Sequence, residues 1–236
     1  MEVAAKGDAA SLAEVRVIAV VLAVVVVITA IAVMYVLSRR RRSPSRYYTL
    51  EECLPPREAE GAFVPEHFVI VDLETTGLDA DTHEIIELAA LKVQRDPARH
   101  TTFAALVTPV HPVPSAITAL TGITQAMLDH QGKPVSEVMT TFVDFVGEAR
   151  LVFFNAPFDC AFLSKAAKGI GRTMHNPVSC ALDMARRAWP GLRSYQLVAL
   201  AQSHGLDTRG HHRALTDCAL TLPIYCAAAT QLGGVD

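Results

Sequence analysis

One stretch constrains the fold most, because a short apolar run leads directly into two carboxylates. Residues 69–71 are Val-Ile-Val, and Asp72, Leu73 and Glu74 follow them. Such a run favours a β-strand, and strand alternation places Asp72 and Glu74 on one face, about 7 Å apart. Two like charges on a buried strand repel each other and are costly to desolvate. A hard divalent cation would offset both costs; the alternative is a strand end whose acids face water.

The cysteine count and the net charge argue against several classes of site. The five cysteines show no C-x-x-C spacing, which argues against a disulfide framework or a zinc site and suits a reducing compartment. From residue 66 onward the chain has 13 Lys and Arg against 17 Asp and Glu, a net charge of −4. Without a broad basic face, this region is a poor candidate for gripping long duplexes through phosphate neutralisation alone.

An apolar segment near the N-terminus predicts a transmembrane helix. Residues 17–37 are 21 residues without a charge, and at 1.5 Å per residue they would form a helix of about 31 Å, which matches the hydrocarbon core of a bilayer. Arginines follow at 39–42. This positive charge predicts a cytoplasmic C-terminal side and an extracytoplasmic tail at 1–16. A buried core helix is the alternative. Membrane lipid is the expected partner of residues 17–42, with the arginines at the headgroups.

The remaining chain divides into a linker, one folded domain and a short tail. Residues 38–66 are basic, contain four prolines and show no sustained periodicity, which indicates a linker. On random-coil scaling, this linker would leave the next domain within roughly 30 Å of the membrane. We expect the folded domain at 67–232 and a C-terminal tail at 233–236.

Hydrophobic periodicity in the folded domain predicts an α/β fold. The stretch from residue 68 and the segments 84–93 and 101–108 are expected to form three strands in an antiparallel meander. A fourth strand is expected at 151–154. Helices are expected at 114–121, 134–146, 161–168, 180–189, 196–204 and 214–231, the last with a kink at Pro223. Strands followed by alternating helix and strand imply a mixed sheet flanked by helices.

Two later segments add acids and a histidine. Asp159 lies where a strand passes into a helix, which is a usual place for ligands in α/β sheets. Asp217 lies about one turn inside the last helix, and His211, His212 and Arg213 precede it. Taken singly, Asp159 is equally well explained as a helix cap, Asp217 as an ordinary helix acid and His212 as a polar loop residue. Their joint occurrence in this order indicates one site.

Three ordered motifs resemble those of the DEDD exonuclease superfamily, also called DnaQ-like. They are V-D-L-E-T-T-G-L-D from residue 71, N-A-P-F-D-x-x-F-L from residue 155 and H-R-A-L-x-D from residue 212. The match covers nearly all of 68–232 and is to the branch with a histidine five residues before the last acid. Arg213 stands where the sister branch has a tyrosine, and Phe154 replaces a histidine that many relatives have. The resemblance implies a ribonuclease H-like fold and 3′-5′ exonuclease activity like that of polymerase III epsilon-subunit proofreaders.

The resemblance also implies a role for each matching residue. Four acids match ligands of two Mg²⁺ or Mn²⁺ ions, and they are Asp72, Glu74, Asp159 and Asp217. His212 matches the general base, and an imidazole with a pKa near 6.5 accepts a proton from water at neutral pH. Thr75, Thr76 and Asn155 are the expected substrate-binding residues, and Asn155 is also a candidate to anchor its turn.

These observations predict a membrane-anchored 3′-5′ exonuclease whose catalytic domain faces the cytoplasm. It would hydrolyse phosphodiester bonds at the 3′ ends of single-stranded DNA or RNA and release nucleoside monophosphates. The alternative is a catalytically inactive, membrane-tethered nucleic-acid-binding or scaffold protein that keeps the nuclease fold. Proofreaders, RNA-trimming enzymes and repair exonucleases share these motifs, so DNA versus RNA, a homodimer and a polymerase association stay open. A membrane anchor is unusual for a replication proofreader, which favours a stand-alone nuclease.

Overall fold

The computed structural model describes residues 67–94 and 96–233. The predicted extracytoplasmic tail (1–16), transmembrane helix (17–37) and linker (38–66) lie outside the described residues, as does nearly all of the predicted C-terminal tail. Among the residues that are described, no helix is both long enough and apolar enough to cross a bilayer.

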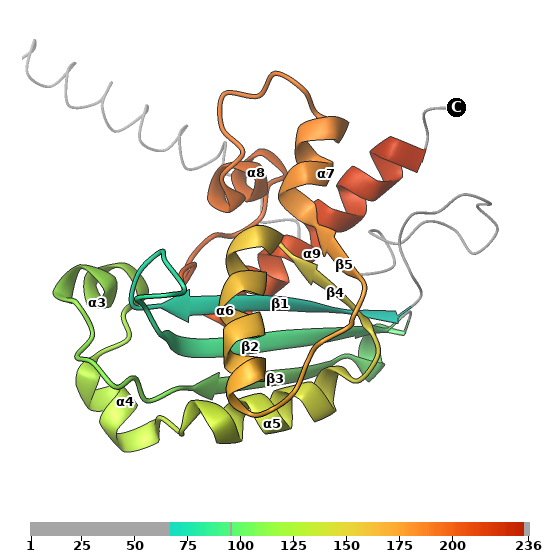
Figure 1. The fold of residues 1–236 in the computed structure, drawn as a ribbon. Helices are drawn as coiled ribbons and strands as arrows, with labels where there is room; N and C mark the ends of the chain where they lie inside the picture. The colour runs from blue at the N-terminus through green and yellow to red at the C-terminus, as the bar shows by residue number, and fades with distance from the viewer. Residues whose placement is uncertain (1–66, 95, 234–236) are drawn as a thin grey trace, which may run out of the picture. The chain divides into compact units, whose positions relative to one another are not determined.

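A five-stranded mixed sheet forms the centre of the fold, with the strand order β3-β2-β1-β4-β5 (Figure 1). The strands are β1 (His67–Thr75), β2 (Ile85–Gln94), β3 (Thr101–Leu106), β4 (Arg150–Phe153) and β5 (Val178–Cys180). The predicted meander is confirmed, since β2 pairs antiparallel with both β1 and β3. The pairs β1–β4 and β4–β5 are parallel. Strand β5 was not predicted, because three residues are too few for alternation to show.

Seven α-helices and one short 3-10 helix accompany the sheet in the described part of the chain. They are η1 (Pro97–Arg99), α3 (Ser115–Thr121), α4 (Gln125–Gln131), α5 (Val135–Val146), α6 (Ala156–Gly169), α7 (Ala181–Ala188), α8 (Leu197–Ser203) and α9 (Ala214–Gly233). The sequence did not predict α4, which Thr124 caps by accepting a hydrogen bond from the N–H of Met127 at 3.2 Å. Helix α9 continues past Pro223 to Gly233.

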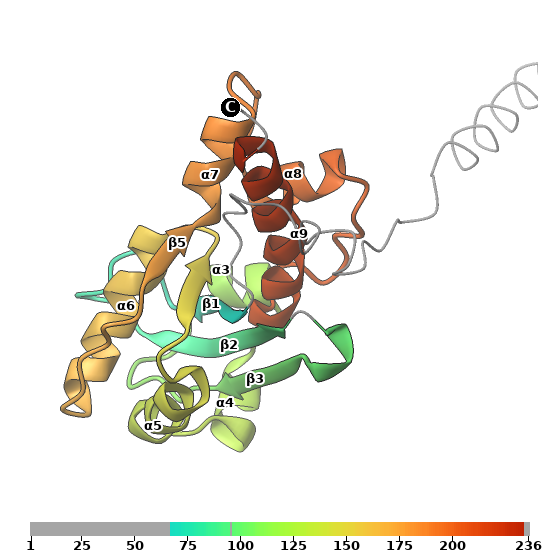
Figure 2. The ribbon, with the colours of Figure 1, turned by 90° about the vertical axis from the view of Figure 1, so that its right-hand side faces the viewer.

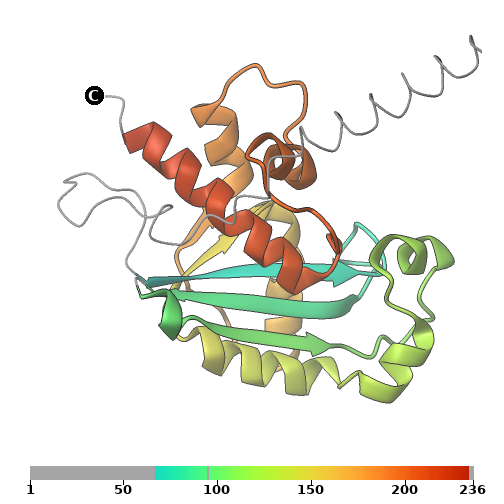
Figure 3. The ribbon, with the colours of Figure 1, turned by 180° about the vertical axis from the view of Figure 1, so that it is seen from behind.

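The alternation of side chains in β1 separates two cores. Val69, Val71 and Leu73 pack with residues of α5 and α6 on one face of the sheet. Phe68 and Ile70 pack with residues of α9 on the other face. Figures 2 and 3 show this arrangement, with α6 on one side of the sheet and α9 crossing the opposite side. The predicted mixed sheet with helices on both faces is therefore confirmed.

Helix α6 begins five residues earlier than the sequence predicted, at Ala156 instead of 161. Pro157 lies in its first turn, where a missing backbone N–H leaves no hydrogen bond unmade. The earlier start places Asp159 inside the first turn of the helix. The helix dipole there favours a negative charge, so the backbone itself supports a carboxylate at this position.

Candidate active site and metal centre

The end of β1 brings two acids to the face of the sheet that α9 covers. Asp72 and Glu74 continue the alternation of Phe68 and Ile70, so they lie on the face of the second core. Glu74 is only 9% exposed, and Asp72 is half-buried. The expectation that strand alternation places both acids on one face is confirmed.

The first turns of two helices supply the other two predicted acids. Asp159 of α6 is 4% exposed, and Asp217 lies in the first turn of α9. These helices lie on opposite faces of the sheet (Figure 2), yet both begin near the end of β1. The acids lie within electrostatic range of one another, since the charges of Asp159, Asp217 and Glu74 each raise the pKa of Asp72.

Burial and mutual repulsion make all four carboxylates harder to ionise. Burial, followed by the charges of Asp159 and Asp217, raises the pKa of Asp72 well above its usual range. Burial and the charge of Asp217 raise the pKa of Glu74 to about 8. Burial raises the pKa of Asp159 to about 8, although backbone N–H groups oppose the shift. Burial also raises the pKa of Asp217 to about 6, against the hydrogen bond from the N–H of His212.

His212 completes the cluster from the loop before α9. One potential ligand atom from each of Glu74, His212 and Asp217 lies within 4.8 Å of the others. The backbone N–H of His212 donates to Oδ2 of Asp217 at 3.3 Å. Burial, followed by the charge of His211, lowers the pKa of His212, so its imidazole is neutral at neutral pH and able to accept a proton.

The backbone of His212 adopts a left-handed conformation, with φ of 63°. Every other described residue with positive φ is glycine. A side chain makes this conformation costly, and it persists only where the surroundings hold it in place. The sequence motif around His212 does not predict this conformation.

The donor set fits a divalent metal ion. Oδ1 of Asp217 is buried and accepts no hydrogen bond from the described residues. An unpaired buried acceptor is costly, and a cation is the partner that would remove that cost. The raised pKa values arise from burial and from the convergence of several acids, and a bound cation would counteract both effects. The compact triad does not include Asp72 and Asp159, which belong to the cluster through their charges.

The expected substrate-binding residues lie beside this cluster and differ in whether their side chains make hydrogen bonds. The hydroxyl of Thr75 donates to the carbonyl of Gly77 at 2.6 Å, and that of Thr76 accepts the N–H of Glu84 at 2.9 Å. Both hydroxyls therefore hold the turn after β1. Asn155 is exposed and makes no side-chain cap at α6. The hypothesis that its side chain anchors the turn is therefore wrong, whereas a contact with substrate stays a prediction.

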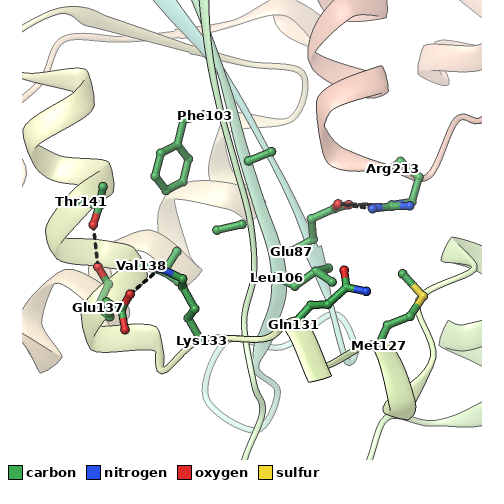
Figure 4. A pocket seen from close by; sticks show the side chains of 12 residues that line it. Glu87, Phe103, Leu106, Met127, Gln131, Lys133, Glu137, Val138, Thr141 and Arg213 are labelled. Atoms are coloured by element: carbon green, nitrogen blue, oxygen red, sulfur yellow. Dashed lines mark hydrogen bonds and ion pairs between the residues drawn. The ribbon is translucent and has the colours of Figure 1, made fainter. Parts of the chain in front are cut away.

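Two residues of the cluster were given no role from the sequence. Glu87 on β2 lies opposite Glu74 and is 5% exposed. Arg213 forms an ion pair with it, at 2.7 Å between Nη2 and Oε1 (Figure 4). The only local signal was an acid flanked by apolar residues within the predicted strand at 84–93. Because 126 residues separate the two partners, the sequence does not show that they meet.

Comparisons with known proteins identify the family of the chain. The family profile described as "Exonuclease" matches residues 69–225. The chain is 40% identical over 167 residues to a DNA polymerase III subunit epsilon from Aquifex aeolicus, covering 70% of this chain and 81% of the relative. It is 37% identical over 160 residues to a PolC-type DNA polymerase III from Clostridium perfringens, covering 67% of this chain but only 11% of that much longer relative.

Solved structures show the same fold. Exonuclease X in complex with 5′ overhanging duplex DNA superposes with a TM-score of 0.56 at 28% identity, covering 69% of this chain and 91% of that one. A structure of exonuclease I gives a TM-score of 0.60 at 19% identity, covering 67% of this chain and 39% of that one. At that identity the likeness concerns the fold alone. The expected ribonuclease H-like architecture agrees with both.

Proposed function

The chain belongs to the exonuclease family as a DnaQ-like, metal-dependent 3′-5′ exonuclease, and from this premise we propose which residues perform the reaction and on which substrate. The proposed metal ligands are Asp72, Glu74, Asp159 and Asp217, and the proposed general base is His212. The observation that carries the assignment is the convergence of Glu74, His212 and Asp217 within 4.8 Å, with buried Asp159 and half-buried Asp72 in electrostatic range.

Each protein group has a defined task in this proposal. Bound divalent ions would supply charge that stabilises the attacking and leaving oxygens of the phosphodiester. Four carboxylates nearly neutralise two Mg²⁺ or Mn²⁺ ions, and hard oxygen donors favour these metals. His212 is neutral and lies beside Glu74 and Asp217, so it is placed to take the proton of the attacking water.

The proposed substrate is the 3′ end of single-stranded DNA or RNA, with nucleoside monophosphates as products. The relatives support this class of ligand, since exonuclease I has been solved with a dT13 oligonucleotide and exonuclease X with overhanging duplex DNA. The net charge of −4 from residue 66 onward disfavours a grip on long duplexes. We further propose that residues 17–37 span a membrane, that 17–42 contact lipid and that the catalytic domain faces the cytoplasm. The apolar run and the four arginines support that proposal.

Replacing the acids tests the metal assignment. Asp72→Ala and Asp217→Ala each should reduce Mg²⁺-dependent digestion of a 5′-labelled single-stranded oligonucleotide by at least about a thousandfold, because charge stabilisation at the phosphate is lost. Asp183→Ala is a matched control, since Asp183 is an exposed acid on α7 that pairs with Arg186. Circular dichroism checks that each variant is folded. Undiminished digestion by both site variants would refute the assignment.

The same assay separates the two adjacent histidines. His212→Ala should lose about 100- to 10,000-fold in rate while it still binds Mn²⁺, because a base contributes in that range. His211→Ala should retain most of the rate. The opposite result would transfer the role of base to His211. Matched DNA and RNA oligomers of several lengths identify the preferred substrate.

A further inference from the structure

We propose that Glu87 and Arg213 are positioning residues of this site, which fasten the start of α9 to β2 and thereby place His212 and Asp217. The inference rests on the proposed function, because it concerns the base and a metal ligand assigned there. Neither Glu87 nor Arg213 is among the residues that the motifs match to chemistry. Their role follows from where the two side chains lie and what they contact.

Glu87 is a buried acid whose oxygens are both engaged. Oε1 accepts hydrogen bonds from Nε and Nη2 of Arg213, at 3.2 and 2.7 Å. Oε2 accepts from Nε of Arg213 at 3.1 Å and from the backbone N–H of Ala214 at 2.9 Å. Asp217 differs, because its Oδ1 has no hydrogen-bond partner among the described residues. Glu87 is therefore committed to α9, whereas Asp217 keeps a free oxygen for a cation.

The bond to Ala214 fixes the beginning of α9. Ala214 is the first residue of the helix, and its buried N–H is one of the groups that no helix can satisfy internally. A carboxylate at a helix N-terminus is also stabilised by the helix dipole. Here the carboxylate comes from a strand 127 residues earlier in the chain, so the cap also attaches the helix to the sheet.

This attachment also supports His212 and Asp217, to which the reaction is assigned. Arg213 immediately follows His212, whose left-handed backbone needs support from its surroundings. Asp217 lies in the same first turn of α9 and accepts the N–H of His212. The Arg213–Glu87 pair on one side and the Asp217 hydrogen bond on the other hold the loop in this conformation. Glu74 lies directly opposite Glu87 on β1, so the fastening point is adjacent to the site.

Arg213 reaches the surface, whereas its partner Glu87 is buried. Its side chain is 42% exposed, whereas that of Glu87 is 6% exposed. Arg213 lines a cavity of about 410 Å³ that β3 and α5 also bound, and Lys133 and Glu137 form an i,i+4 ion pair that lines the same cavity at the start of α5 (Figure 4). That second pair is exposed and distant from His212 along the chain, which makes Lys133 a matched control.

The test compares Arg213→Ala, Glu87→Gln and Arg213→Lys with Lys133→Ala. For Arg213→Ala and Glu87→Gln we expect kcat to fall by about 10- to 100-fold and the dissociation constant for Mn²⁺ to rise by a similar factor, the usual effect of losing a partner behind a metal site. KM should change by less than about threefold. Arg213→Lys should recover part of the loss, because it keeps the charge but not the planar fork. Lys133→Ala should match the wild type.

Hydrogen exchange supplies a readout that does not require activity. In Arg213→Ala and Glu87→Gln, amides of 211–218 should exchange at least about tenfold faster than in the wild type, while the rest of α9 is unchanged. Unchanged exchange together with a kcat within twofold of wild type would overturn the inference. A higher KM at unchanged kcat would also overturn it, by assigning Arg213 to substrate. If Arg213→Ala does not fold, Arg213→Lys decides by the same measurements.

The two proposals fail in different ways. A folded wild-type protein that digests no DNA or RNA oligonucleotide with Mg²⁺ or Mn²⁺ would refute the proposed function. The exchange rates and Mn²⁺ affinities of the variants would still decide whether Glu87 and Arg213 position the loop and α9.

Discussion

Two residues of the proposed site, Asp159 and Glu74, are carboxylates that the fold keeps away from water. Asp159 is 4% exposed and Glu74 is 9% exposed, and burial is the largest cause of the raised pKa of each. Ionised acids in such positions do not stabilise the folded state. Their presence is explained by the ions they would hold, because a bound divalent cation reverses the cost of burying them.

Their raised pKa values predict how stability depends on pH in the absence of metal. Unfolded Asp and Glu release their protons near pH 4, whereas Asp159 and Glu74 keep theirs in the folded protein up to about pH 8. The folded state therefore binds more protons between these values, and stability falls as the pH rises through that range. With a chelator present, Tm should fall by on the order of 5 °C or more between pH 5 and pH 8, at roughly 2–4 °C per kcal/mol.

Calorimetry with two comparisons checks this expectation. Asp159→Asn should show a shallower dependence of Tm on pH, since one of the two groups no longer titrates. Mg²⁺ should raise Tm more at pH 8 than at pH 5, because protonated carboxylates bind metal poorly. A chelated wild-type protein whose Tm is flat from pH 5 to pH 8 would contradict the buried-acid account.

Among the secondary-structure elements, β1 and α6 both carry acids of the proposed site, and the turn from β1 to β2 connects them. Glu74 lies just before this turn, and Lys165 of α6 donates to the carbonyls of Ala80 and Asp81 at its tip, at 2.6 and 3.1 Å. Helix α6 also carries Asp159. The turn is therefore held both by its own threonine hydroxyls and by the helix that supplies another proposed ligand.

Gly77 allows this turn to close. A Cβ at this position would lie 2.5 Å from ring atoms of His83, whose Nδ1 lies 3.3 Å from Oγ1 of Thr76. Gly77→Ala should displace that ring and destabilise the protein by about 1–3 kcal/mol, the usual range for overpacking. Urea unfolding measures the change.

Two variants make the turn experiment specific. Adding His83→Ala to Gly77→Ala should remove most of the extra cost, since the double variant no longer has the ring that obstructs the methyl group. Gly169→Ala should not destabilise, because a Cβ there meets nothing within 4 Å and the residue lies in α6. The steric explanation would be refuted if Gly77→Ala lowered the free energy of unfolding by the same amount with and without the His83 ring.

At the scale of the whole molecule, the proposed membrane anchor and the catalytic domain are separate parts of the chain. The apolar run at 17–37 ends 30 residues before β1 begins at His67. The full chain should remain in the membrane fraction after alkaline extraction, and a chain that starts at residue 66 should not. Protease added outside intact cells should leave the catalytic domain uncut if that domain faces the cytoplasm. Recovery of the full chain in the soluble fraction would refute the anchor.

Features that depend on local spacing along the chain could be predicted before the fold was known. A strand has a period of two, so Asp72 and Glu74 had to share a face, and three ordered motifs were enough to identify the exonuclease family before any coordinates. Most helices and strands were predicted for the same reason. Strand β5 and helix α4 were missed. Strand β5 has only three residues, and helix α4 buries only Leu128, so neither shows a clear apolar pattern.

Contacts between residues that are distant along the chain became visible only in the folded protein. The hydrogen-bonded pair of Glu87 and Arg213, the orphaned oxygen of Asp217 and the left-handed backbone of His212 lie around the start of α9. The Glu87–Arg213 pair has no signature in neighbouring residues, since its partners are 126 residues apart. The motifs thus predicted four acids of the proposed site, whereas the contact of Glu87 with Arg213 became visible only in the packing of α9 on the sheet.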